Sequence, residues 1–186
     1  AEVSGVRVLR VAAPGRSLIG RRIETSILAT PYLRWGWYVD PALYGNGPGD
    51  GLPRGLRLVV GFKGGLPGSP QLIDHLFGGI PGDYPRSDRV IELHLGGLGA
   101  PRSENAMIEF DAVNDQGIRR TIRPATYGQA GQWHVEAVDL ASLYAGFWPR
   151  DRISDVVITF IAAGSLQAQL PENATVGYIA EILLTR

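Results

Sequence analysis

The sequence predicts an all-β fold, a jelly-roll-like antiparallel β-sandwich with one short helix, and three observations support this. Short segments rich in Val, Ile, Leu and aromatic residues recur along the chain, and several alternate apolar with polar residues as half-buried strands do. The 25 glycines and 13 prolines lie between these segments as turns and are not gathered in one linker. Helical segments do not alternate with strands, as they would in an α/β protein. The length of 186 residues suits a single domain over residues 1–186.

Ten segments are predicted as strands because turn residues bound each one and β-branched or aromatic residues fill it. In chain order they are residues 6–13, 17–24, 32–40, 55–63, 89–96, 106–113, 118–125, 133–139, 155–163 and 175–184. One helix is predicted for LASLYAGF, since Asp139 can cap its first amides and Pro149 follows soon after its end. Residues 41–54 and 64–88 are too long for tight hairpins, and we expect functional loops or crossings between sheets there.

The composition argues against several classes of protein. Lys and Arg balance Asp and Glu at 18 each, which is unlike a nucleic-acid-binding protein. The absence of cysteine excludes disulfides, thiolate metal sites and a cysteine nucleophile. No apolar run approaches the roughly 20 residues that span a bilayer, so no membrane span is expected. The start AEVSG has neither an initiator Met nor a leader, as in a bacterial protein cleaved after export or a trimmed chain, and we expect a periplasmic or secreted location.

Two parts of the chain resemble known families. The succession WHVEAVDL, ISDVVITFIAAG and GYIAEILL resembles the end of galactose-binding-like jelly rolls, a superfamily that contains many carbohydrate-binding modules. The stretch VLRVAAPGRSLIGRRI followed by PYLRWGWYVD resembles an uncharacterised family of exported bacterial proteins, which brings no activity with it. The first resemblance implies a polysaccharide or oligosaccharide partner by analogy. It also implies a possible structural calcium on loops, where the acidic residues that could supply oxygens are Asp40, Asp50, Asp83 and Asp88.

The strand YLRWGWYVD raises the question whether its two tryptophans form a core or an exposed binding platform. Residues two apart share a face of a strand, so Trp35 and Trp37 lie together with Leu33 and Val39. This uniformly apolar side favours the core between two sheets, with an aromatic sugar platform as the alternative. The opposite side carries the candidate ligand-binding residues Arg34 and Tyr38, together with Asp40.

A second candidate site follows from the same alternation in four other strands. In WHVEA we expect Trp133 and Val135 to face the core, which leaves His134 on the other face with Glu136. If the four strands are neighbours in one sheet, a mixed charged face results that contains Glu92, His94, Glu109, Arg123, His134 and Glu136. This face is open to three interpretations: plain solvated surface, a sugar-binding groove, or a catalytic or metal site.

Three functions remain open at this stage, and no catalytic residue or cofactor is assigned. The first is a non-catalytic polysaccharide-binding domain of an exported bacterial protein. The second is an enzyme on the same scaffold, either a hydrolase with Glu92 and Glu109 as its carboxylates or a polysaccharide lyase with a His or Tyr base. The third is a structural or interaction domain of a cell-envelope assembly, whose partner would be another protein.

Overall fold

The ten predicted strands and the predicted helix are all confirmed by the structure, a computed structural model. It describes residues 1–3, 5–12, 17–39, 56–65, 87–95, 108–110, 118–123, 131–165 and 175–186. The elements are β1 (Glu2–Val3), β2 (Val6–Ala12), β3 (Ser17–Ser26), β4 (Tyr32–Val39), β5 (Leu56–Lys63), β6 (Arg89–Leu95), β7 (Ile108–Phe110), β8 (Ile118–Arg123), β9 (Trp133–Asp139), α2 (Leu140–Phe147), η3 (Ile153–Asp155), β10 (Val157–Ser165) and β11 (Thr175–Thr185).

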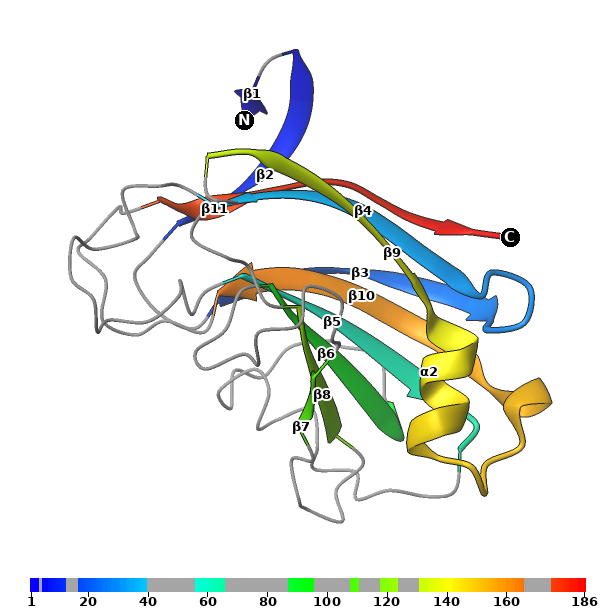
Figure 1. Ribbon diagram of the computed structural model, residues 1–186. Helices are drawn as coiled ribbons and strands as arrows, with labels where there is room; N and C mark the ends of the chain where they lie inside the picture. The colour runs from blue at the N-terminus through cyan, green and yellow to red at the C-terminus, as the bar shows by residue number, and fades with distance from the viewer. Residues whose placement is uncertain are drawn as a thin grey trace.

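The strands form two sheets that lie one above the other (Figure 1). The five-stranded sheet has the order β1-β2-β11-β4-β9, and the six-stranded sheet has the order β3-β10-β5-β6-β8-β7. Consecutive strands β2, β3, β4 and β5 alternate between the sheets, so each connection between them leads from one layer to the other. Among the strands that the structure describes, the pairing is antiparallel except between β6 and β8, which run parallel. The predicted sandwich is therefore correct, with one parallel pair that the sequence pattern did not indicate.

The core lies between the two sheets and answers the tryptophan question. Trp35 and Trp37 of β4 are only 1% and 2% exposed, and they belong to one apolar cluster with Leu58, Val60 and Phe62 of β5. The prediction that both indoles are core residues is confirmed. Neither indole N–H finds a hydrogen-bond acceptor in the part of the chain that the structure describes.

Helix α2 connects the two sheets at one end of the sandwich (Figure 1) and begins as the sequence predicts. Asp139 is its N-cap: one carboxylate oxygen accepts from the Ser142 backbone N–H at 2.8 Å, and the other accepts from the Ser142 hydroxyl at 2.7 Å. The bond from the Ser142 amide lowers the pKa of Asp139 below its ordinary value. No helix in the described ranges is long and apolar enough to cross a membrane.

Removal of this cap gives a first testable prediction. Asp139→Ala should lower the free energy of unfolding at pH 7 by about 1 kcal/mol, the usual value of an N-cap. Because the folded-state pKa of Asp139 is lowered, the charged cap stabilises the protein above the ordinary carboxyl pKa and loses this effect as the pH falls through the folded pKa. Urea unfolding at pH 7 and pH 3 measures both effects. Asp139→Asn, which caps without titrating, is the matched control, and equal pH dependence in the wild type and in this control variant would contradict the assignment.

A buried polar cluster closes the same end of the sandwich. The Asp151 carboxylate accepts from Arg89 Nε at 3.2 Å and from the Tyr144 hydroxyl at 2.8 Å. The Arg89 guanidinium also lies over the Trp148 ring, 5.5 Å from its centre. Burial raises the pKa of Tyr144 well above its ordinary value, and the hydrogen bond to Asp151 adds to this effect. Tyr144 therefore stays a neutral hydrogen-bond donor, and the cluster attaches α2 to the six-stranded sheet through β6.

Candidate functional site

The candidate site lies on the outer face of the six-stranded sheet, which points away from the five-stranded sheet. Leu58 and Val60 of β5 belong to the core, so the alternate residues Arg57 and Lys63 face outward. In the ladder between β5 and β6, Glu92 lies opposite Val59, which places Glu92 on this outer face as well. The face therefore receives charged residues from adjacent strands.

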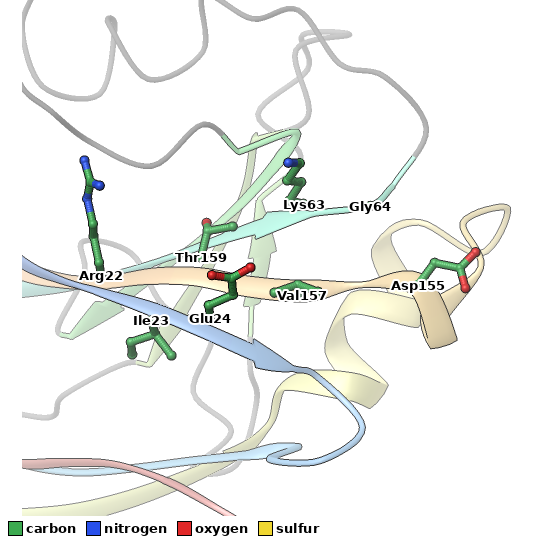
Figure 2. Close-up of a pocket in the computed structure, with 8 residues that line it drawn as sticks. All are labelled: Arg22, Ile23, Glu24, Lys63, Gly64, Asp155, Val157 and Thr159. Carbon is green, nitrogen blue, oxygen red and sulfur yellow. The ribbon is translucent and has the colours of Figure 1, made fainter.

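A cleft of about 620 Å³ lies on this outer face, over strands β3, β10 and β5 at one end of the sheet (Figure 2). Four side chains of the lining point to the same side of the sheet: Arg22, Glu24, Thr159 and Lys63 (Figure 2). Ile23 points to the opposite side. The reason is the period of two in β3, which sends Arg22 and Glu24 outward on either side of Ile23. The full lining is Arg22, Ile23, Glu24, Lys63, Gly64, Asp155, Val157 and Thr159.

The lining combines charges of both signs with a hydroxyl group. Arg22, Glu24 and Lys63 are exposed, because β3 is an edge strand and β5 ends at Lys63. Thr159 is buried, and its hydroxyl lies 2.6 Å from the Ser87 hydroxyl. The cleft therefore offers hydrogen-bond donors and acceptors at its rim, and the buried Thr159 contributes to its lining.

The end of the cleft depends on a glycine. Gly64 has φ +99°, and a side chain there would place its first carbon 2.1 Å from the Asp155 carbonyl oxygen. The Gly64 N–H donates to the Asp88 carboxylate at 3.0 Å. Only glycine allows the chain to turn this close to η3 at the end of β5. This close approach places Lys63 and Asp155 in the lining of the same cleft.

Arg57 and Glu92 form a buried ion pair on the same outer face, away from the exposed rim. Arg57 Nη1 lies 3.3 Å from Glu92 Oε1, and the two side chains are 3% and 1% exposed. Removing both charges from water is costly, and the attraction between the two charges offsets part of this cost. Glu92 is thus a structural carboxylate in this conformation.

Glycoside hydrolysis needs two carboxylates about 5–5.5 Å or 6.5–9.5 Å apart. Among the described strand residues of this outer face, the carboxylates are Glu24 and Glu92. Strands β10 and β5 separate their strands, so three strand spacings, about 14 Å, lie between the two backbones. Glu24 and Glu92 are therefore too far apart along the sheet to be assigned as a hydrolytic pair.

The residues of the predicted mixed charged face do not lie on one sheet, so the prediction of a single charged face is wrong. Strand β9, which carries His134 and Glu136, pairs with β4 in the other sheet, whereas Glu92 lies on β6. Within the six-stranded sheet, His94 lies opposite Arg57 in register. Of the other two predicted residues in this sheet, Glu109 pairs with Thr121 and Arg123 pairs with Leu95. Whether Glu92, His94, Glu109, Arg123 or His134 binds a ligand stays a prediction.

The orientation predicted for β9 is also wrong. His134 lies opposite Trp37, and its ring stacks on that indole with centres 4.5 Å apart, so His134 faces the interior. Val135 is 65% exposed on the outer side, where Trp133 contacts Tyr38. The reason is that β9 is an edge strand, where an interior-facing polar side chain keeps part of its contact with water.

The remaining predicted ligand residues, Arg34 and Tyr38, lie on a different surface, the outer face of the five-stranded sheet.

Sequence reasoning missed the cleft residues Arg22, Glu24 and Lys63. The alternation in RRIE was a usable signal, but their proximity follows from the order β3-β10-β5, which no local pattern encodes.

The predicted calcium site stays a prediction, because most of its acidic residues lie outside the part of the chain that the structure describes. Asp40, Asp50 and Asp83 lie outside the described ranges, and the Asp88 carboxylate accepts from Gly64. Within the described part of the chain, no group of three or more His, Asp or Glu side chains could hold a metal ion.

Comparison with known proteins identifies the architecture. A thermostable cellulase derived from Cel12A of Rhodothermus marinus superimposes with a TM-score of 0.50 and 11% identity, over 97% of this chain and 82% of that one. The fold is a β-jelly roll. A second solved structure, from a comparison of family 12 glycoside hydrolases, has a TM-score of 0.48 and 10% identity; it matches 88% of this chain, which spans 65% of that protein. A family 12 xyloglucanase from Bacillus licheniformis has a TM-score of 0.45 and 9% identity, over 96% and 79% of the two chains.

The other comparisons assign no family. No protein-family model matches the chain. No curated protein matches it either. At about one residue in ten identical, the likeness to the cellulase concerns the jelly-roll fold and not the residues of its site. The finer resemblance to galactose-binding-like jelly rolls stays a prediction.

Proposed function

We propose that this protein binds polysaccharide in the cleft over β3, β10 and β5. The observation that carries the proposal is the cleft itself, an open hollow of about 620 Å³ whose exposed rim is made by Arg22, Glu24 and Lys63. This volume lies within the roughly 300–1,000 Å³ typical of ligand sites. The two cationic and two anionic side chains of the lining balance, which suits a neutral, hydroxyl-rich ligand better than a strongly charged one.

The fold supports polysaccharide as the ligand class. The solved structure that shares the jelly roll over 97% of this chain is named as a cellulase, a protein that acts on a polysaccharide. A location outside the cytoplasm, where such polymers occur, is part of the same proposal.

The main form of the proposal is binding without cleavage. Glu92 is paired with Arg57, and three strand spacings lie between the backbones that carry Glu24 and Glu92, the two carboxylates of the described strands on this face. Glycoside hydrolysis is the second candidate, favoured by the cellulase fold and by the position of Glu92 on the cleft face. It would need a second carboxylate close to Glu92.

Replacement of one cleft arginine tests the binding site. Arg22→Ala should weaken the binding of a soluble β-glucan, such as hydroxyethylcellulose, about tenfold, because a charge-assisted hydrogen bond is worth roughly 1.5 kcal/mol or more. Arg21→Ala is the matched control, since Arg21 is exposed on the same strand and alternates to the other side. Affinity electrophoresis in a gel containing the polymer measures both variants. Equal retention of the two variants would rule out the cleft as the site.

A reducing-end assay separates the two candidates. We expect no new reducing ends after long incubation of the wild-type protein with the polysaccharide that it binds. Release of reducing ends that disappears in a folded Glu92→Gln variant would establish the hydrolase candidate in place of simple binding.

A further inference from the structure

Three aromatic rings form a row across the outer face of the five-stranded sheet, on the opposite side of the sandwich from the cleft. Trp133, Tyr38 and Tyr178 lie on adjacent strands β9, β4 and β11 and are directly opposite one another in register. The ring centres are 5.7 Å apart for Tyr38 and Trp133, and 5.8 Å apart for Tyr38 and Tyr178. We call these three residues the aromatic row.

The aromatic row does not belong to the core. Trp37 and Ile179, the chain neighbours of Tyr38 and Tyr178, are buried in the cluster between the sheets, so the row faces the other way. All three of its members are half-buried and keep exposed surface. Large aromatic side chains are usually buried in a core, so three partly exposed rings in contact on an outer face form a candidate binding surface.

The residues beside the row give the surface its relief. The next register row contains Ala180 and Gly36, which are small and lie below the level of the rings, and then the exposed Val135. One step further, Arg34 is exposed between Leu183 and Ala137. A ligand that lies along the row would thus contact the three rings with one edge. Its other edge would lie over Ala180 and Gly36 and face the Arg34 guanidinium.

This relief matches one chain of a polysaccharide. A pyranose ring with equatorial hydroxyls presents apolar C–H faces that pack on an aromatic face, while its hydroxyls accept hydrogen bonds at the edges. The rings are inclined to one another by 47° and 57°, so they do not form a flat platform for a crystalline surface and suit a single twisted chain. Nucleic-acid bases also stack on aromatic rows, in sites that combine the rings with a positively charged groove. Beside this row the register places two cations, Arg10 opposite Tyr178 and Arg34 further along β4, in a chain whose net charge is zero.

We propose that the aromatic row is a second binding surface for a neutral polysaccharide chain, built from pyranose units with equatorial hydroxyls. Arg34 donates to the hydroxyls at the far side of the row. Because the row and the cleft are on opposite faces of the sandwich, one molecule could hold two chains, or two segments of one chain, and gain retention from both.

Tryptophan fluorescence provides a direct test. The chain has four tryptophans; Trp35, Trp37 and Trp148 are at most 8% exposed, whereas Trp133 is half-buried on the outer face. Quenching of the folded protein by iodide therefore reports mainly on Trp133. Cellohexaose or hydroxyethylcellulose should protect this fluorescence from iodide, and Tyr178→Ala should weaken the protective binding at least tenfold.

Two variants make the result specific. Tyr32→Ala is the matched control, because Tyr32 is a 43% exposed tyrosine on the same strand as Tyr38, far from the row. It should leave protection unchanged, and so should Arg22→Ala, which alters only the cleft. Protection lost in Tyr178→Ala and kept in Arg22→Ala establishes the row even if the cleft proves inactive.

Three outcomes would overturn the inference. The first is equal protection in Tyr178→Ala, Tyr32→Ala and wild type. The second is protection that is abolished by Arg22→Ala alone, which would leave the cleft as the binding site and remove the row. The third is protection by polyuridylate or by polygalacturonate but by neither neutral glucan, which would replace the proposed ligand class.

Discussion

Trp35→Ala is expected to lower the free energy of unfolding by about 3–5 kcal/mol, the usual cost of removing a large aromatic side chain from a core. Trp35 is 1% exposed and fills the space between the two sheets. Its removal loses the burial of an indole and leaves a cavity, because strands held in two hydrogen-bonded ladders cannot collapse around it. Urea unfolding, followed by far-UV circular dichroism, measures the loss.

Two further variants keep this prediction testable if the alanine protein does not fold. Trp35→Phe should cost much less than Trp35→Ala, since it keeps most of the apolar volume and removes an indole N–H that has no acceptor among the described residues. Trp133→Ala, on the outer face, should also cost much less, because Trp133 keeps part of its surface in water. A Trp35→Ala protein as stable as wild type would show that this side chain is not part of the core.

Glu92→Ala should be comparably damaging, with an expected loss of about 3–5 kcal/mol, because it removes the carboxylate that pairs with the buried Arg57 guanidinium. The pair is 3.3 Å apart and almost fully excluded from water. Val59, which lies opposite Glu92 in the ladder, is also fully buried, so the charge has apolar surroundings on that side. Equilibrium unfolding in urea at pH 7 measures the effect.

A double variant identifies the cause of this loss. Arg57→Met combined with Glu92→Leu removes both charges at similar volume and should recover most of the stability, since a buried ion pair is seldom better than a well-packed apolar pair. If Glu92→Ala leaves the unfolding midpoint unchanged, Glu92 is not held as a structural carboxylate, and the hydrolase candidate gains the residue as a catalyst.

The sequence was sufficient to predict the strands, because period-two alternation and turn residues are local signals. It was also sufficient for the helix, whose start depends on one capping side chain, Asp139. The core position of Trp35 and Trp37 followed from Leu33 on the same face. In a sandwich, a uniformly apolar face of a strand is buried against the other sheet. These features depend on neighbouring residues only.

The candidate sites depend on strand order, which is not local. Alternation in WHVEA separates His134 from Val135 but does not say which of them faces inward, and on edge strand β9 the polar residue does. Lys63 and Thr159 are almost a hundred positions apart in the chain, and only the pairing of β5 with β10 brings them to one cleft. The aromatic row likewise unites three strands whose order in the sheet could not be derived from their sequences.

The most direct test of the central claim is the retention of the wild-type protein on an array of immobilised polysaccharides, with and without calcium. We expect retention on a coherent set of neutral polysaccharides built from equatorially hydroxylated sugars, with little change on calcium removal, since the binding residues proposed here need no metal. Absence of retention on every neutral and acidic polysaccharide under both conditions would contradict polysaccharide binding and would point to a protein partner instead.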